Sequence, residues 1–184
     1  TQSTFGADPA GIESVRALGY DAWIEDQFNQ PATRIRPPLL ANPNSDPDNL
    51  YPNTFFWNLW WKHAVTAPDQ LRQRVAFALS EILVVSDVGV LNNNGRILAT
   101  YYDTLVDHAF GNFRELLERV SLTAAMGRYL DMLGNQKGSL TSGTHPNENY
   151  AREILQLFSI GLYRLWPDAT LVMDALMMAV WRRG

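Results

Sequence analysis

The segment HPNENYAREILQLFSIGL, which begins at His145, contains the residues best suited to acid–base chemistry in this 184-residue chain. Its polar side chains recur every three or four residues, so they share one side of a predicted helix over residues 145–163. These polar residues are Asn149, Arg152, Glu153, Gln156 and Ser159. A groove lined by Glu148 and Glu153, with Arg152 between them, could supply an acid and a base to a bound substrate. Asn149 and Gln156 would then bind that substrate.

The same residues also have an ordinary structural interpretation. Glu148 lies in the predicted first turn and four residues before Arg152, which is the spacing of a helical ion pair. Because an unpaired guanidinium is costly to bury, we expect Arg152 to pair with Glu148 or with a carboxylate of another helix. In that arrangement Arg152→Ala would cost about 3 to 5 kcal/mol, and the carboxylates would be held in salt bridges.

Three tryptophans form a second group of candidate binding residues. Trp57, Trp60 and Trp61 belong to the row TFFWNLWWKHAV, which predicts a helix over residues 53–65 that is buried on most sides. Their ring faces could stack on sugar rings. The alternative is core packing between helices, because large aromatic residues at helical spacing are typical of protein cores.

No metal site and no cofactor are predicted. Asp103 and Asp107 share one helical face, where their charges repel unless a cation or a proton lies between them. In the segment 42–48, residues with side-chain oxygen atoms occupy every second position, as the ligands of calcium-binding loops do. Pro47, however, occupies the position at which such loops need glycine. The chain has no cysteine, and its histidines are scattered at positions 63, 108 and 145. The motifs typical of serine hydrolases and of nucleotide- and dinucleotide-binding proteins do not occur.

Composition narrows the range of partners. The formal charge of -4 and the lack of a basic stripe argue against nucleic acid. Among the 15 basic residues only Lys62 and Lys137 are lysines, which favours internal ion pairs made by arginine. No apolar run reaches the roughly 20 residues that a membrane-spanning helix needs. The expected partner is a carbohydrate or another small-molecule substrate.

These groups would be positioned by an all-α, bundle-like single domain of about seven helices spanning residues 1–184. A helical hairpin over residues 8–28 breaks at Gly19. Further helices are predicted over residues 53–65, 66–83, 97–111, 113–120, 124–133 and 145–163. Asp8, Asn112 and Thr123 are expected to be the N-caps of the helices that follow them. Two long loops, 31–52 with many prolines and 134–144 with many small residues, interrupt them.

The helix over residues 66–83 is the most clearly marked of these. Thr66 and Asp69 have the spacing of a capping box. The apolar residues that follow at helical spacing are expected to be buried, because tertiary packing stabilises such a stripe. The stripe consists of Leu71, Val75, Leu79 and Ile82.

Several long stretches resemble the bacterial family catalogued as domain of unknown function 1800. They are QSTFGAD, LGYDAWIEDQF, LRQRVAFALSEILVVS, FGNFRELLERVSLTAAMGRYLDMLGNQKG and, above all, HPNENYAREILQLFSIGLYRL. The resemblance covers residues 1–174 and implies a helical N-terminal portion of a longer, exported protein. It assigns no reaction and no catalytic residues. The final ALMMAVWRRG departs from the family pattern, so we expect a fragment whose apolar segment 170–184 could support a homo-oligomer.

Two functional hypotheses follow. The first is a hydrolase, acting on glycosidic bonds, that uses Glu148, Glu153 and Arg152 with aromatic help from the tryptophans. The alternative is a non-catalytic exported scaffold or binding module. An open cleft that separates the two carboxyl groups by about 5 to 9.5 Å would favour the hydrolase.

Overall fold

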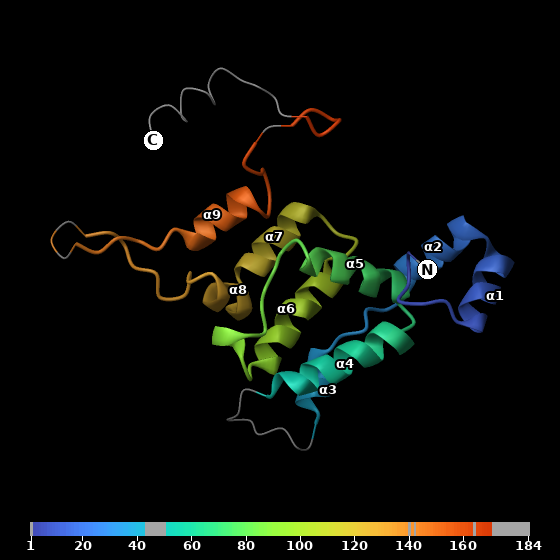
Figure 1. Ribbon diagram of the computed structural model, residues 1–184. Coiled ribbons are helices and arrows are strands. Elements are labelled where there is room, and N and C mark those ends of the chain that lie inside the picture. Colours follow the sequence, from blue (N-terminus) through green and yellow to red (C-terminus); the bar gives the residue numbers. More distant parts are fainter. Residues whose placement is uncertain (1, 43–50, 140, 142, 164, 171–184) are drawn as a thin grey trace. The chain divides into compact units, whose positions relative to one another are not determined.

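The computed structural model describes residues 2–42, 51–139, 141, 143–163 and 165–170. Over these residues the chain forms nine α-helices and one 3-10 helix, with no β-strand (Figure 1). The predicted all-α fold is confirmed, although the helices are shorter and more numerous than the sequence suggested. The chain divides into two compact units, Thr1–Asn147 and Glu148–Gly184, which are described separately. The single-domain organisation stays a prediction.

The first unit is built around α6 (Gly95–Asp107), which packs against five other α-helices and the 3-10 helix. The helices that contact it are α3 (Arg36–Leu40), α4 (Asn53–Thr66), α5 (Gln70–Ser80), α7 (Phe113–Ser121), α8 (Ala124–Tyr129) and η1 (Gly89–Leu91). Leu105 and Val106 of α6 are completely buried. Burial of each such side chain contributes about 1.5 to 3 kcal/mol, so α6 is the centre of the core.

The N-terminal hairpin consists of α1 (Pro9–Leu18) and α2 (Tyr20–Asn29). Gly19 separates the two helices at a positive φ of 78°, a conformation that glycine adopts without strain. The predicted break in this hairpin is therefore confirmed.

Three predicted N-caps are also confirmed. Asp8, Asn112 and Thr123 each accept hydrogen bonds from backbone N–H groups in the first turn of the helix that follows. These bonds satisfy donors that have no partner within the helix. The starts of α1, α7 and α8 are thus encoded locally.

The proline-rich region 31–52, predicted as a long loop without a regular element of useful length, contains the short helix α3. Pro37 and Pro38 lie in the first turn, where a helix does not need their missing N–H groups. Asp103 of α6 caps this helix from outside, because its carboxylate accepts the N–H groups of Ile35 at 2.7 Å and Arg36 at 2.9 Å. Residues 43–50, which include most of the calcium-like segment, lie outside the described residues.

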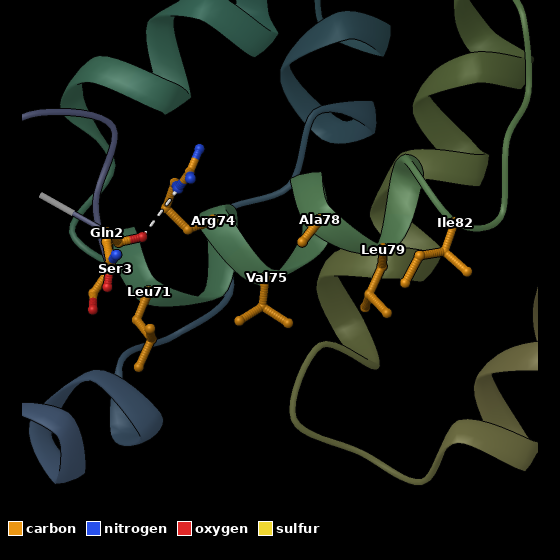
Figure 2. A pocket seen from close by; sticks show the side chains of 8 residues that line it. All are labelled: Gln2, Ser3, Leu71, Arg74, Val75, Ala78, Leu79 and Ile82. Carbon is orange, nitrogen blue, oxygen red and sulfur yellow. Dashed lines mark hydrogen bonds between the residues drawn. The ribbon is translucent and has the colours of Figure 1, made fainter. Parts of the chain in front are cut away.

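The predicted burial of the stripe on α5 holds only in part. Leu71, Val75 and Leu79 are half-buried, and Ile82, just after the helix, is 48% exposed. Figure 2 shows these four side chains projecting from the same side of α5. The residues that α5 buries are Gln73 and Ala76, on its other side.

The predicted capping box before α5 is also absent. The Thr66 hydroxyl donates to the Lys62 carbonyl and so belongs to the end of α4. Asp69 precedes α5, but its carboxylate accepts from the Thr33 N–H instead of capping its own helix. Tertiary hydrogen bonds have therefore replaced the local cap.

The predicted loop over residues 134–144 contains no helix among its described residues. The side chain of Asn135 closes its base, accepting from the Asn147 N–H at 2.8 Å and donating to the Asn147 carbonyl at 2.7 Å. Within the loop, the Ser139 N–H donates to the Thr144 carbonyl.

The second unit contains α9 (Asn149–Gln156), which is shorter than the predicted helix over residues 145–163. The chain turns beyond Gln156, where the N–H groups of Leu157 and Phe158 both bond the Glu153 carbonyl. Gly161 then adopts a positive φ of 77° and donates to the Leu155 carbonyl, as glycines that end helices do. Residues 171–184 lie outside the described residues, so the expected oligomerisation segment stays a prediction.

Among the described residues, no helix is long and apolar enough to span a membrane.

Candidate functional site

The candidate acid–base residues lie at the start and along the length of α9. Glu148 is exposed and occupies the N-cap position without a capping hydrogen bond from its side chain. Arg152 donates to the Asn149 Oδ1 at 3.2 Å, and its Nε lies 3.7 Å from the Glu153 Oε1. The prediction that Glu148 or another helix pairs with Arg152 is therefore wrong, because the partner is the adjacent residue.

Solvent reaches this ion pair. The Arg152 side chain is 54% exposed and the Glu153 side chain 16% exposed. Exposed pairs contribute under about 1 kcal/mol, since water screens them and the side chains lose rotational freedom. The earlier figure of 3 to 5 kcal/mol, which assumed burial, does not apply to this pair.

Glu148 and Glu153 differ in their surroundings. The two glutamates are five residues apart, and in a helix this spacing separates their side-chain directions by about 140°. The two carboxylates therefore do not point to a common position. Only Glu153 is sheltered, and its Oε2 is buried without a hydrogen-bond partner. Asn149 and Gln156 are half-buried in the same helix.

The three candidate tryptophans lie in α4 of the first unit. Trp60 is buried and makes edge contacts with Trp61 at a centroid distance of 4.9 Å and with Trp57 at 5.9 Å. Trp57 and Trp61 are 39% and 62% exposed, so the prediction that this helix is buried on most sides is wrong. The interplanar angles of 87° and 72° give these rings no common flat face for stacking on a sugar.

A buried polar cluster, which sequence reasoning missed, joins α5 to the segment before α3. Asp69 is completely buried, and its Oδ2 accepts from the Thr33 N–H at 2.9 Å and the Gln73 Nε2 at 3.1 Å. The Nε of Arg72 lies 3.9 Å from the same oxygen. The Gln73 amide also donates to the Thr33 carbonyl. The expectation of internal arginine ion pairs is confirmed here, where the arginine is only 12% exposed.

The two aspartates of α6 bind the same stretch of chain as the cluster does. Asp103 accepts from the two backbone N–H groups before and at the start of α3, while Asp107 pairs with Arg34 at 2.8 Å. Burial raises the pKa of Asp103 to about 6, opposed by its backbone hydrogen bonds. Both carboxylates therefore have a structural role, because they hold the start of α3 and the residues before it.

The histidines do not gather into a metal site. Burial is the main reason that the pKa of His63 lies below its ordinary value. His108 contacts the Thr104 carbonyl through Nδ1, and His145 is exposed. Over the described residues, no group of three or more His, Cys, Asp or Glu residues could hold a metal ion.

The N-terminal hairpin borders a cavity of about 650 Å³ that is open to solvent, which we call the N-terminal cavity. Its walls come from the segment 3–8, from α1 and α2, and from the α4–α5 link. The apolar part of the lining includes Ile12, Val15, Trp23, Ile24, Ala67 and Pro68.

A smaller hollow of about 290 Å³ lies along the exposed side of α5 (Figure 2). Leu71, Val75, Leu79 and Ile82 form its floor, and Ser3 lines both this hollow and the N-terminal cavity. The sequence carried a signal for both hollows, namely apolar residues at helical spacing. That signal does not distinguish a buried face from a half-open one.

Comparison with known proteins identifies the family and nothing more specific. Neither the curated proteins nor the solved structures contain a match. Residues 1–172 match the family of proteins of unknown function designated DUF1800, which confirms the predicted resemblance. Because this match covers most of the 184 residues, the chain belongs to that family.

Proposed function

We propose that this chain acts as a non-catalytic binding module. The observation that carries the proposal is the N-terminal cavity, whose volume of about 650 Å³ falls within the range of small-molecule sites. Its walls join residues 3–27 to the α4–α5 link, so tertiary packing between these two segments is needed to form the cavity. A mostly apolar cavity with a few polar groups is typical of ligand-binding sites.

The hydrogen bonding of the acidic residues supports the same proposal. Asp69 and Asp103 are buried, and both bind backbone N–H groups between Thr33 and Arg36. In α9, Glu153 is paired with the neighbouring Arg152. These carboxylates have structural partners, whereas a general acid or base must reach a substrate.

The hydrolase hypothesis stays as a second candidate because of one feature of Glu153. Its Oε2 is buried without a hydrogen-bond partner, and a catalytic role is one explanation for such an unsatisfied group. In this proposal Glu153 would serve as the acid or base, with Glu148 as the second carboxylate and a glycosidic bond as the target.

One parallel screen separates the two proposals. The purified chain is incubated with a panel of hydrolase substrates, and the melting temperature is measured with the same compounds. A binding module is expected to leave every compound intact while some raise the melting temperature, since a ligand at 100 times its Kd stabilises by about 2.7 kcal/mol. Turnover that disappears in Glu153→Gln would overturn the binding proposal in favour of the hydrolase.

A further inference from the structure

We infer that the N-terminal cavity takes an uncharged, largely apolar small molecule, an inference that rests on the proposed binding role and gives it a ligand class. Two independent features of the cavity lead to this class. The first is the exposure of its apolar walls, and the second is the internal hydrogen bonding of its amide and charged side chains.

The apolar walls belong to a hairpin that is little buried. Among the described helices, α1 packs only against α2, and none of its residues is buried. Ile12 and Ile24, which line the cavity, are 48% and 37% exposed. Apolar surface left in water costs about 25 cal/mol per Å², so an apolar ligand between the hairpin and the α4–α5 link would recover that free energy. Trp23 adds an aromatic surface to the same wall.

The two glutamines of the cavity wall are already engaged in internal hydrogen bonds. Gln27 donates to the Pro68 carbonyl at 3.2 Å and accepts from the Leu71 N–H at 3.1 Å. Gln70 donates to the Ala67 carbonyl at 2.9 Å and accepts from the Phe5 N–H at 3.2 Å. These amides fix the α4–α5 link, so a ligand could bond them only by breaking those bonds.

The charged residues of the wall also have partners near them in the sequence. Asp8 caps α1 through the Gly11 N–H, and Arg16 pairs with Glu13 at 2.9 Å. Asp26 accepts from the Gln30 amide. A sugar must exchange its many hydrogen bonds with water for equivalent ones in the site, and unmatched groups cost about 1 to 3 kcal/mol each. The hydroxyls of Ser3, Ser14 and Tyr20 also line the cavity and make no protein hydrogen bond among the described residues, but they could satisfy only a few of a sugar's groups. The cavity therefore favours a hydrocarbon or aromatic ligand over a carbohydrate.

The inference is tested with N-phenyl-1-naphthylamine, an uncharged probe whose fluorescence rises in an apolar site, added to the full 184-residue chain. We expect saturable binding of one probe per chain. The uncharged aliphatic compound 1-decanol should displace the probe, and methyl glucoside should not.

Variants locate the binding within the molecule. Ala10→Phe adds a ring to the cavity wall from an exposed position, and Ile24→Asp places a charge there. Each should weaken probe binding at least about tenfold. Ala22→Phe, at an exposed position of α2 outside the lining, and Val75→Lys, in the hollow along α5, are matched controls that should bind as the wild type does. Circular dichroism confirms that each variant is folded.

The outcomes separate this inference from the binding role on which it rests. Displacement of the probe by methyl glucoside would overturn the apolar class and leave the binding role intact. Equal binding by all four variants, or a loss confined to Val75→Lys, would overturn the assignment to this cavity. A displacing ligand recovered chemically changed would refute the non-catalytic role, whereas loss confined to Ala10→Phe and Ile24→Asp would support the cavity as the binding site.

Discussion

Replacement of Asp69 tests how the N-terminal region is held together. Asp69→Ala removes a completely buried carboxylate whose Oδ2 accepts two hydrogen bonds and lies 3.9 Å from Arg72. Three donors lose this acceptor or counter-ion at once: the Thr33 N–H, the Gln73 amide and the Arg72 guanidinium. The fold should therefore lose much more stability than after the loss of a surface pair.

The expected cost follows from the contacts of each donor. The Thr33 N–H has no replacement acceptor among its recorded contacts, and an unsatisfied buried donor costs about 1 to 3 kcal/mol. Gln73 retains its bond to the Thr33 carbonyl, so its loss is smaller. Arg72 retains weak contacts with backbone carbonyls and lies over the ring of Phe110, but it loses its counter-charge. The total is about 3 to 5 kcal/mol, the range measured when one partner of a buried ion pair is removed.

Urea unfolding followed by circular dichroism measures this loss. Arg152→Ala is the matched control, because its partner Glu153 is also close in sequence but the arginine is 54% exposed, and it should cost under about 1 kcal/mol. Asp69→Asn keeps one acceptor and removes the charge, so it should fall between the two. If Asp69→Ala proves no more costly than Arg152→Ala, the buried cluster does not stabilise the fold and the reasoning is refuted.

Three further predictions concern other parts of the first unit. The raised pKa of Asp103, about 6 against an ordinary 3.8, means that the stability this group provides is complete below about pH 3.8 and lost as the pH rises through 6. The loss is about 3 kcal/mol. Between pH 4 and 7 the free energy of unfolding of Asp103→Asn should therefore fall less than that of the wild type. Parallel curves of unfolding free energy against pH for the two proteins would contradict this. Asn112→Ala removes the cap of α7 and should cost about 1 kcal/mol in urea unfolding, while no change would mean that the cap is replaced. Trp60→Ala opens the aromatic cluster and should cost about 3 to 5 kcal/mol, whereas Trp61→Ala, at an exposed ring, should cost much less in the same assay.

The sequence alone determined the local features of this protein. The helical periodicity, the break at Gly19 and the N-caps Asp8, Asn112 and Thr123 were predicted correctly, because each depends on residues within one or two turns of each other. The family was also recognisable from the sequence, since long matching stretches need no knowledge of contacts.

Only the tertiary structure determined which face of each helix is buried. The stripe that begins at Leu71 has the spacing of a buried face, but α5 instead buries the side that carries Gln73, because Thr33 and Asp69 need polar partners there. In the same way, α3 forms because Asp103, 67 residues further along the chain, caps its first N–H groups. Within α9, the sequence spacing grouped Glu148 with Arg152, whereas the structure pairs that arginine with its neighbour Glu153. Spacing along a helix fixes which residues share a face, but packing against distant segments decides whether that face is buried, paired or left open to a ligand.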